Sequence, residues 1–146
     1  YNILNEVKDV RSLTQVAIRD VSEEEVVRME SDPRITCFSD YLLSNNRFEG
    51  MSWQEQCQKI IDTLSEKVYV SFDIDGLNPE YSPNTGTQVP GGITFNEASY
   101  LLDSLVRSGC RIVGFHLGEV VSRKDNEWDA NVGARLLYKL CNFTLK

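Results

Sequence analysis

The sequence predicts an α/β fold in which a parallel β-sheet carries helices on both faces. Short apolar segments alternate with capped amphipathic helices along the 146 residues, and this alternation is typical of parallel strands joined by helical crossovers. Two segments, 67–75 and 111–120, are apolar enough to be buried strands, and the segment between them has helical periodicity. A chain of this length can bury a core, so we expect a single folding unit.

The first half predicts two strands with a helix between them. Residues Leu13–Arg19 (LTQVAIR) fit a short strand, and a helix follows with Ser22 as N-cap and Glu25 at the capping-box spacing. Residues 35–38 (ITCF) fit a second short strand or extended segment. Residues 39–50 are then interpreted as a segment that leads into a loop.

The second half predicts a strand–helix–strand crossover flanked by two helices. The expected elements are a helix capped by Ser52, a strand over 67–75, a helix from Thr94 to a stop at Gly109, a strand over 111–120 and a helix over 131–142. In parallel sheets ligands bind beyond the carboxyl ends of the strands. Asp73, Asp75 and Glu119 are all placed at such ends.

Composition excludes several classes of partner. The net charge of -7 and the absence of a Lys/Arg run exclude nucleic acid. No apolar run is long enough to span a bilayer and no secretion signal precedes the first strand, so we expect a cytoplasmic protein without a membrane partner. The four cysteines lack any CxxC pair and are expected to be reduced core thiols. Because the chain opens on Tyr1 without a methionine, we expect a piece of a longer protein.

The strand over 67–75 ends in two carboxylates, Asp73 and Asp75, which the alternation places on one face. Two like charges so close require a cation, a proton or solvent to compensate them, and oxygen ligands suit Mg²⁺ or Mn²⁺. Asp residues in a DG turn are also common without any metal. On the pair alone these two interpretations stand equal. An EF-hand calcium loop is excluded because Gly76 comes at its fourth position instead of its sixth.

Two other classes of function remain open at this point. A strand that ends in DxDG resembles the haloacid-dehalogenase phosphatases, in which the two aspartates, here Asp73 and Asp75, are nucleophile and general acid. Leu77 and the mid-chain position of the strand depart from that pattern. A non-catalytic structural or partner-binding domain is the second alternative.

A longer string resembles another family much more closely. Residues 68–94, VYVSFDIDGLNPEYSPNTGTQVPGGIT, resemble the signature SFDIDxLDPxxxPxTGTPxxGGLT of the ureohydrolases, the arginase, agmatinase and formimidoylglutamase superfamily. AIRDVSEEE (17–25) and VGFHLGEV (113–120) fall in the family's order. The resemblance therefore spans residues 1–146 as the C-terminal part of a single ureohydrolase domain, closest to bacterial agmatinase-like members.

The resemblance implies an arginase-like three-layer fold and a binuclear manganese centre. Asp73 matches the aspartate that bridges both Mn²⁺ ions, and Asp75 matches the one that binds a single ion. Thr87 matches a threonine near the guanidinium, and Glu119 matches the carboxylate that grips it. The implied reaction is hydrolysis of a C–N bond in a small cationic guanidino substrate with release of urea, by a homo-oligomer (trimer or hexamer). Without the resemblance, Glu119 and Thr87 would be a surface charge and a turn hydroxyl.

Several positions depart from the family pattern. Asn78 replaces an Asp, His116 stands where the strand often carries Asp, and Val-Val-Ser follows Glu119, which argues against arginine as the substrate. We interpret His116 as a core residue or a support for a ligand. The GGDH and DAHxD motifs, which supply the remaining metal ligands, are absent. We therefore predict agmatinase-like chemistry first, with arginase or formimidoylglutamase chemistry as alternatives, and an isolated chain that binds Mn²⁺ weakly and is inactive.

Overall fold

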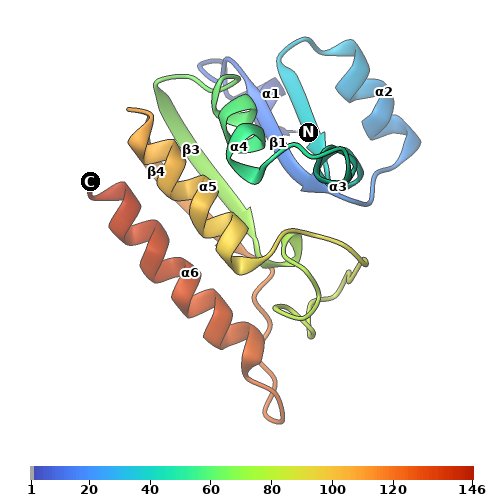
Figure 1. Cartoon of the computed structure of the whole chain (residues 1–146), viewed down its shortest axis with the longest axis vertical. Helices are drawn as coiled ribbons and strands as arrows, with labels where there is room; N and C mark the ends of the chain where they lie inside the picture. The colour runs from blue at the N-terminus through green and yellow to red at the C-terminus, as the bar shows by residue number, and fades with distance from the viewer. Residues whose placement is uncertain (1) are drawn as a thin grey trace.

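In the computed structural model, which describes residues 2–146, parallel strands are joined through helices, as the α/β prediction requires (Figure 1). The elements are α1 Asn2–Glu6, β1 Leu13–Ile18, α2 Glu23–Ser31, β2 Ile35–Ser39, α3 Asp40–Phe48, α4 Trp53–Ile61, β3 Lys67–Asp73, the 3₁₀ turn η1 Ile74–Gly76, α5 Phe95–Arg107, β4 Arg111–Gly118 and α6 Trp128–Thr144. All three predicted capping boxes form, at the starts of α2, α4 and α5. Among the described residues no helix has both the length and the apolarity needed to cross a bilayer.

The strands form two parallel pairs. β1 pairs with β2, and β3 pairs with β4 across the crossover helix α5, which confirms the predicted strand–helix–strand unit. The register of β1 shifts between Val16 and Ile18, and the intervening Ala17 has a left-handed φ of 61°. The described strands thus make two separate two-stranded sheets instead of one continuous sheet.

Helices α5 and α6 lie side by side on one face of the β3–β4 pair (Figure 1). Along β3 the side chains alternate: Val68, Val70 and Phe72 are half-buried and pack into the core, whereas those of the opposite face are exposed. The exposed members are Lys67, Tyr69, Ser71 and Asp73. Asp73 is therefore presented on the face of the sheet that lies opposite these two helices.

Part of the segment interpreted as a loop, 39–50, is the helix α3. Ser39 caps it by accepting a hydrogen bond from the backbone N–H of Leu42 at 3.2 Å. Its Ser-Asn-Asn run has weak helix propensity, which hides the helix in the sequence. Leu43 is completely buried against the core, so tertiary packing decides the conformation here. The helix α6 likewise begins three residues before the predicted start, at Trp128.

The four cysteines are all free, as predicted, but their environments differ. Cys57 is buried in the core, and burial, together with the nearby Glu97, raises the pKa of its thiol to about 12. Cys37 and Cys110 are half-buried. Cys141 lies on the outer side of α6 and is exposed, so the expectation of a core thiol is wrong for that residue.

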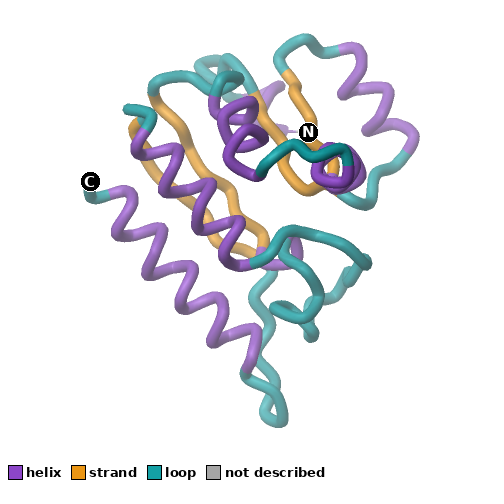
Figure 2. The backbone as a smooth tube through the Cα atoms, viewed as in Figure 1, coloured by secondary structure: helices purple, strands orange, loops and turns teal. Residues whose placement is uncertain are grey.

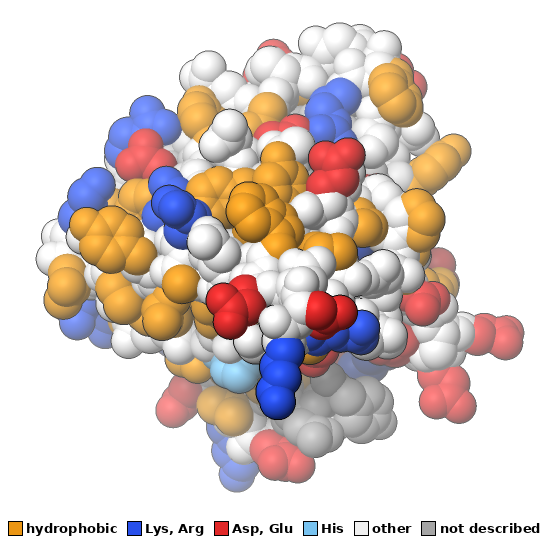
Figure 3. Space-filling view, turned by 90° about the horizontal axis from the view of Figure 1, so that it is seen from below, with side chains coloured by type: hydrophobic (Ala, Val, Ile, Leu, Met, Phe, Trp, Pro, Cys, Tyr) orange, Lys and Arg blue, Asp and Glu red, His pale blue; other side chains and the backbone are white. Residues whose placement is uncertain are grey.

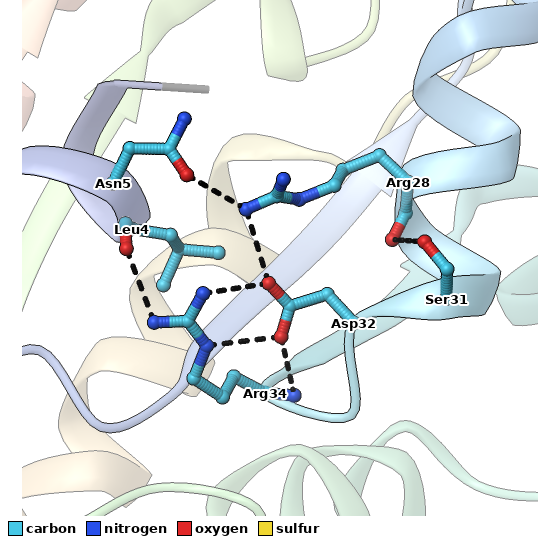
Figure 4. A network of polar contacts seen from close by, with 6 residues as sticks. All are labelled: Leu4, Asn5, Arg28, Ser31, Asp32 and Arg34. Carbon is cyan, nitrogen blue, oxygen red and sulfur yellow. Dashed lines mark hydrogen bonds and ion pairs between the residues drawn. The ribbon is translucent and has the colours of Figure 1, made fainter.

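A polar network ties α1 and α2 to the start of β2 (Figure 4). Arg34 donates two hydrogen bonds from its guanidinium to the Asp32 carboxylate, at 2.9 and 2.7 Å, and a third to the backbone oxygen of Leu4 at 3.1 Å. Arg28 bridges Asp32 and the side chain of Asn5. The network fixes the turn that leads from α2 into β2.

This network predicts a pH dependence at the acid end. The hydrogen bonds from Arg34, followed by its charge and that of Arg28, lower the pKa of Asp32 from 3.8 to about 2. Because the pKa is lowered on folding, the stability that Asp32 contributes is complete above about pH 4 and is lost as the pH falls towards 2. We expect the carboxyl ¹³C signal of Asp32 to titrate near pH 2 in the native protein. In Arg34→Gln it should titrate closer to pH 4, and an unchanged midpoint in that variant would contradict the assignment.

Candidate active site

Asp73 and Asp75 stand at the carboxyl end of β3, where the sequence places them. The strand ends at Asp73, whose side chain is exposed, and η1 then turns the chain. Asp75 belongs to that turn and is half-buried. The predicted alternation therefore stops at Asp73, and the expectation that both carboxylates share one strand face is wrong. The reason is that the 3₁₀ turn rotates the chain by about a third of a turn per residue.

Thr87 is brought back to Asp75 across twelve positions of sequence. Its Oγ1 donates a hydrogen bond to Asp75 Oδ2 at 3.3 Å. This contact joins a predicted metal-binding residue to a predicted substrate-binding residue. It also gives the Asp75 carboxylate a fixed partner, whereas no hydrogen bond holds the Asp73 carboxylate within residues 2–146.

The aperiodic segment between η1 and α5 is a loop with closed ends (Figure 2). Leu77 and Ile93 form an isolated parallel bridge, and the N–H of Asn78 donates to the Ile93 carbonyl at 2.9 Å. Both bridge residues are buried in the core. We call residues 77–93 the site loop. Its ends are as firmly placed as a strand pair, which lets its tip present Thr87 in one position.

Arg19 fixes one side of the site loop. Its guanidinium donates to the backbone oxygens of Val89 at 3.1 Å, Gly76 at 3.2 Å and Ala17 at 3.4 Å, and also to that of Asp75. One side chain just beyond β1 therefore connects the end of β1, the turn that carries Asp75 and the far arm of the loop. The five donors of a guanidinium make such multiple contacts possible.

Two further carboxylates anchor the site loop. Asp40, at the start of α3, accepts from the N–H of Gly92 at 3.1 Å. Asp129, completely buried in α6, accepts from the N–H and the side-chain amide of Asn84 at 3.1 and 2.7 Å. Sequence analysis did not single out Arg19, Asp40 or Asp129. The only sequence signal was their nearness to strand ends or helix starts, which many residues share.

Glu119 follows directly after β4 and has a left-handed backbone, with φ of 59°. Its neighbour Gly118 is the register partner of Asp73, so the two strands deliver Glu119 and Asp73 to the same edge. Glu119 is exposed, and among the described residues it has no contact with Asp75 or Thr87. A non-glycine residue held at positive φ is strained, and such strain is frequent at functional sites.

This strain predicts an inverted order of stability at position 119. At ordinary positions glycine is less stable than alanine by about 0.5–1 kcal/mol. At positive φ the left-handed backbone costs alanine about 1–2 kcal/mol, which glycine does not lose. We therefore expect Glu119→Gly to be more stable than Glu119→Ala by about 0.5–1 kcal/mol in urea denaturation. If alanine proves the more stable, Glu119 is not left-handed in solution.

His116 is exposed on β4, so it is not a core residue. It pairs with Ser71 and lies one alternation before Gly118, the partner of Asp73. Figure 3 looks onto the end of the molecule where β3 finishes: hydrophobic side chains gather over its middle, and acidic and basic side chains and a histidine lie around them. The site is therefore an open edge with carboxylates on it.

The donor set suits part of a manganese site. Asp73 and Asp75 offer hard oxygen ligands, which Mn²⁺ accepts. No group of three or more His, Cys, Asp and Glu side chains able to hold a metal ion occurs in residues 2–146. This agrees with the prediction that the remaining ligands lie outside the chain.

The largest groove of the described residues lies elsewhere. It has a volume of about 420 Å³ and runs between α3 and the far arm of the site loop, where Tyr41, Phe48 and Pro90 line it. Asp73, Asp75, Thr87 and Glu119 do not line it. An open edge that awaits further ligands need not form a pocket, so the chemistry decides the site here.

Comparison with known proteins agrees with this site. The chain is 37% identical over 78 residues to an arginase of Schizosaccharomyces pombe (53% of this chain and 24% of that one). It is 33% identical over 94 residues to the guanidinobutyrase of Pseudomonas aeruginosa (60% and 29%). The crystal structure of the agmatine ureohydrolase of Thermoplasma volcanium superposes with a TM-score of 0.70 at 27% identity (90% and 42%).

The chain thus spans less than half the length of these relatives. The similarity supports neither the phosphatase nor the non-catalytic alternative. The model of the arginase family matches residues 2–142, nearly the whole sequence. On this match, and on the shared arrangement of its strands and helices, the chain belongs to the arginase family.

Proposed function

We propose that this chain supplies the Asp73 and Asp75 carboxylates to the binuclear manganese centre of a guanidino hydrolase. The observation that supports this best is the hydrogen bond between Thr87 and Asp75, which joins the expected substrate and metal groups in one place. Membership of the arginase family supports it independently.

The chain's own residues have distinct tasks in the proposed reaction. A pair of bound metal ions makes hydroxide available near neutral pH. Asp73 and Asp75 hold the ions at the edge of the sheet. Glu119 pairs with the planar guanidinium, whose parallel N–H groups suit a carboxylate. Thr87, fixed by the site loop, orients the substrate's reacting carbon against the ions.

We propose agmatine-like substrates first. The relatives and solved structures named above act, by their names, as an arginase, a guanidinobutyrase and an agmatine ureohydrolase. Val121 and Ser122 after Glu119 depart from the Asn-Pro that the resemblance associates with arginases. Arginine and formimidoylglutamate remain the alternative substrates. We further propose that the complete protein is a trimer or hexamer.

The isolated chain should bind Mn²⁺ weakly and should not release urea. Asp73 and Asp75 provide two of the ligands, and a full pair of coordination shells needs more donors than residues 2–146 bring together. We expect the GGDH and DAHxD motifs in a segment that precedes Tyr1 in the complete protein.

Product release from the complete protein tests the function. We expect Mn²⁺-dependent release of urea from agmatine, with arginine and 4-guanidinobutyrate compared in parallel, and of formamide from formimidoylglutamate. Asp73→Asn should lower kcat/KM at least about a hundredfold, because the metal supplies several kcal/mol of transition-state stabilisation. Asp62→Asn, at the opposite end of β3, should leave it unchanged. Full activity in Asp73→Asn would refute the proposal.

A further inference from the structure

His116 and Asp73 meet over a glycine on the exposed face of β3–β4. Gly118 is the register partner of Asp73, and His116 pairs with Ser71 two positions earlier. A Cβ placed on Gly118 would lie 2.5 Å from Asp73 Oδ1 and 2.9 Å from His116 Nε2. The carboxylate oxygen and the imidazole nitrogen therefore flank one point in space, which is open because residue 118 has no side chain.

Neither side chain is engaged by the protein. Within residues 2–146 no hydrogen bond or ion pair joins Asp73 to His116, and none ties either side chain to a third residue. Both are exposed, so packing does not fix them either. By contrast, the Asp75 carboxylate is held by Thr87. An imidazole nitrogen and a carboxylate oxygen that face a shared space without bonding to each other are suited to bind one cation between them.

We propose that Asp73 Oδ1 and His116 Nε2 together ligate one divalent metal ion above Gly118. The inference rests on the proposed function in so far as Asp73 is a metal ligand there, and it adds a nitrogen ligand that the family signature does not supply. An imidazole ligand shifts the preference of an oxygen site towards Zn²⁺ and Co²⁺. The chain should therefore bind Zn²⁺ more tightly than two carboxylates alone would.

The chain contains a single histidine, so its ring signals report on this site without ambiguity. The test is titration of the ¹⁵N-labelled 146-residue chain with Zn²⁺. We expect the Nε2 resonance of His116 to shift, with Nδ1 less affected. Asp73→Asn and His116→Ala should each weaken Zn²⁺ binding at least about tenfold, comparable to the loss of residues that support a metal. Asp62→Asn is the matched control and should bind as the wild type does.

Gly118→Ala is the sharper variant because it keeps both ligands and fills the space between them. We expect it to weaken Zn²⁺ binding as much as His116→Ala does, with an unchanged circular dichroism spectrum. An Nε2 signal that Zn²⁺ does not shift, a shift that persists in Asp73→Asn, or undiminished binding by a folded Gly118→Ala would each overturn the proposal.

These outcomes are separate from those of the product assay. If the complete protein releases urea but the His116 signal ignores Zn²⁺, the guanidino hydrolase stands and the histidine ligand is wrong. If Zn²⁺ is bound by both residues but no guanidino substrate is hydrolysed, the metal pair stands and the proposed reaction is wrong.

Discussion

Replacing Gly92 with alanine is expected to destabilise the protein by about 3 kcal/mol or more. Gly92 has φ of 92°, and an added Cβ would lie 2.7 Å from both the carbonyl carbon and the oxygen of Leu77 and 2.8 Å from the Arg19 guanidinium. Those atoms belong to the closed base of the site loop and to its main anchor, so they cannot move aside cheaply. The site loop should loosen even where the chain remains folded. Urea denaturation measures the loss of stability.

Gly50→Ala separates the two causes of that loss. Gly50 has φ of 93°, almost the same as Gly92, but an added Cβ there meets no atom within 4 Å. Its substitution should cost only the left-handed backbone strain, about 1–2 kcal/mol. If the two variants are equally stable, crowding against Leu77 contributes nothing and the described base of the loop is wrong.

Replacing Arg19 with methionine is expected to cost about 2 kcal/mol or more, because several carbonyls lose a charged donor at once. Those carbonyls belong to Val89, Gly76, Ala17 and Asp75. Methionine keeps most of the stem, so the loss reports the guanidinium. Since Thr87 depends on this loop, proteolysis of residues 77–93 should also become faster.

Arg19→Lys should recover only a small part of the stability, because one ammonium cannot reach carbonyls in several directions. Arg135→Met is the matched control: Arg135 is exposed on α6 and donates only to Asn131 on the same helix. That change should stay within about 0.5 kcal/mol of the wild type. A lysine variant as stable as the wild type would show that Arg19 acts as a simple charge.

The local signals in the sequence were sufficient for much of the fold. The capping boxes at Ser22, Ser52 and Thr94 and the crossover between β3 and β4 depend on spacings of a few residues or on one period of hydrophobicity. The helix α3 was missed because its propensity is weak and the burial of Leu43 decides it. Burial of one side chain by distant elements leaves no local pattern.

The candidate site divides in the same way. Asp73 and Asp75 could be named from a contiguous motif, and Thr87 and Glu119 from the resemblance around it. Their supports could not, because Arg19 meets Asp75 across 56 positions and Asp129 meets Asn84 across 45. The open space over Gly118 was also invisible, since it depends on the register between β3 and β4.

The central claim, that Asp73 and Asp75 bind manganese, is tested most directly by paramagnetic broadening of the amide signals of the 146-residue chain. This measurement detects binding even when it is weak. We expect small additions of Mn²⁺ to broaden the signals of residues 73–76 and 118–119 first, and Asp73→Asn combined with Asp75→Asn to abolish that pattern while Asp62→Asn preserves it. Broadening that is confined to other parts of the chain, or that survives the double substitution, would contradict the claim.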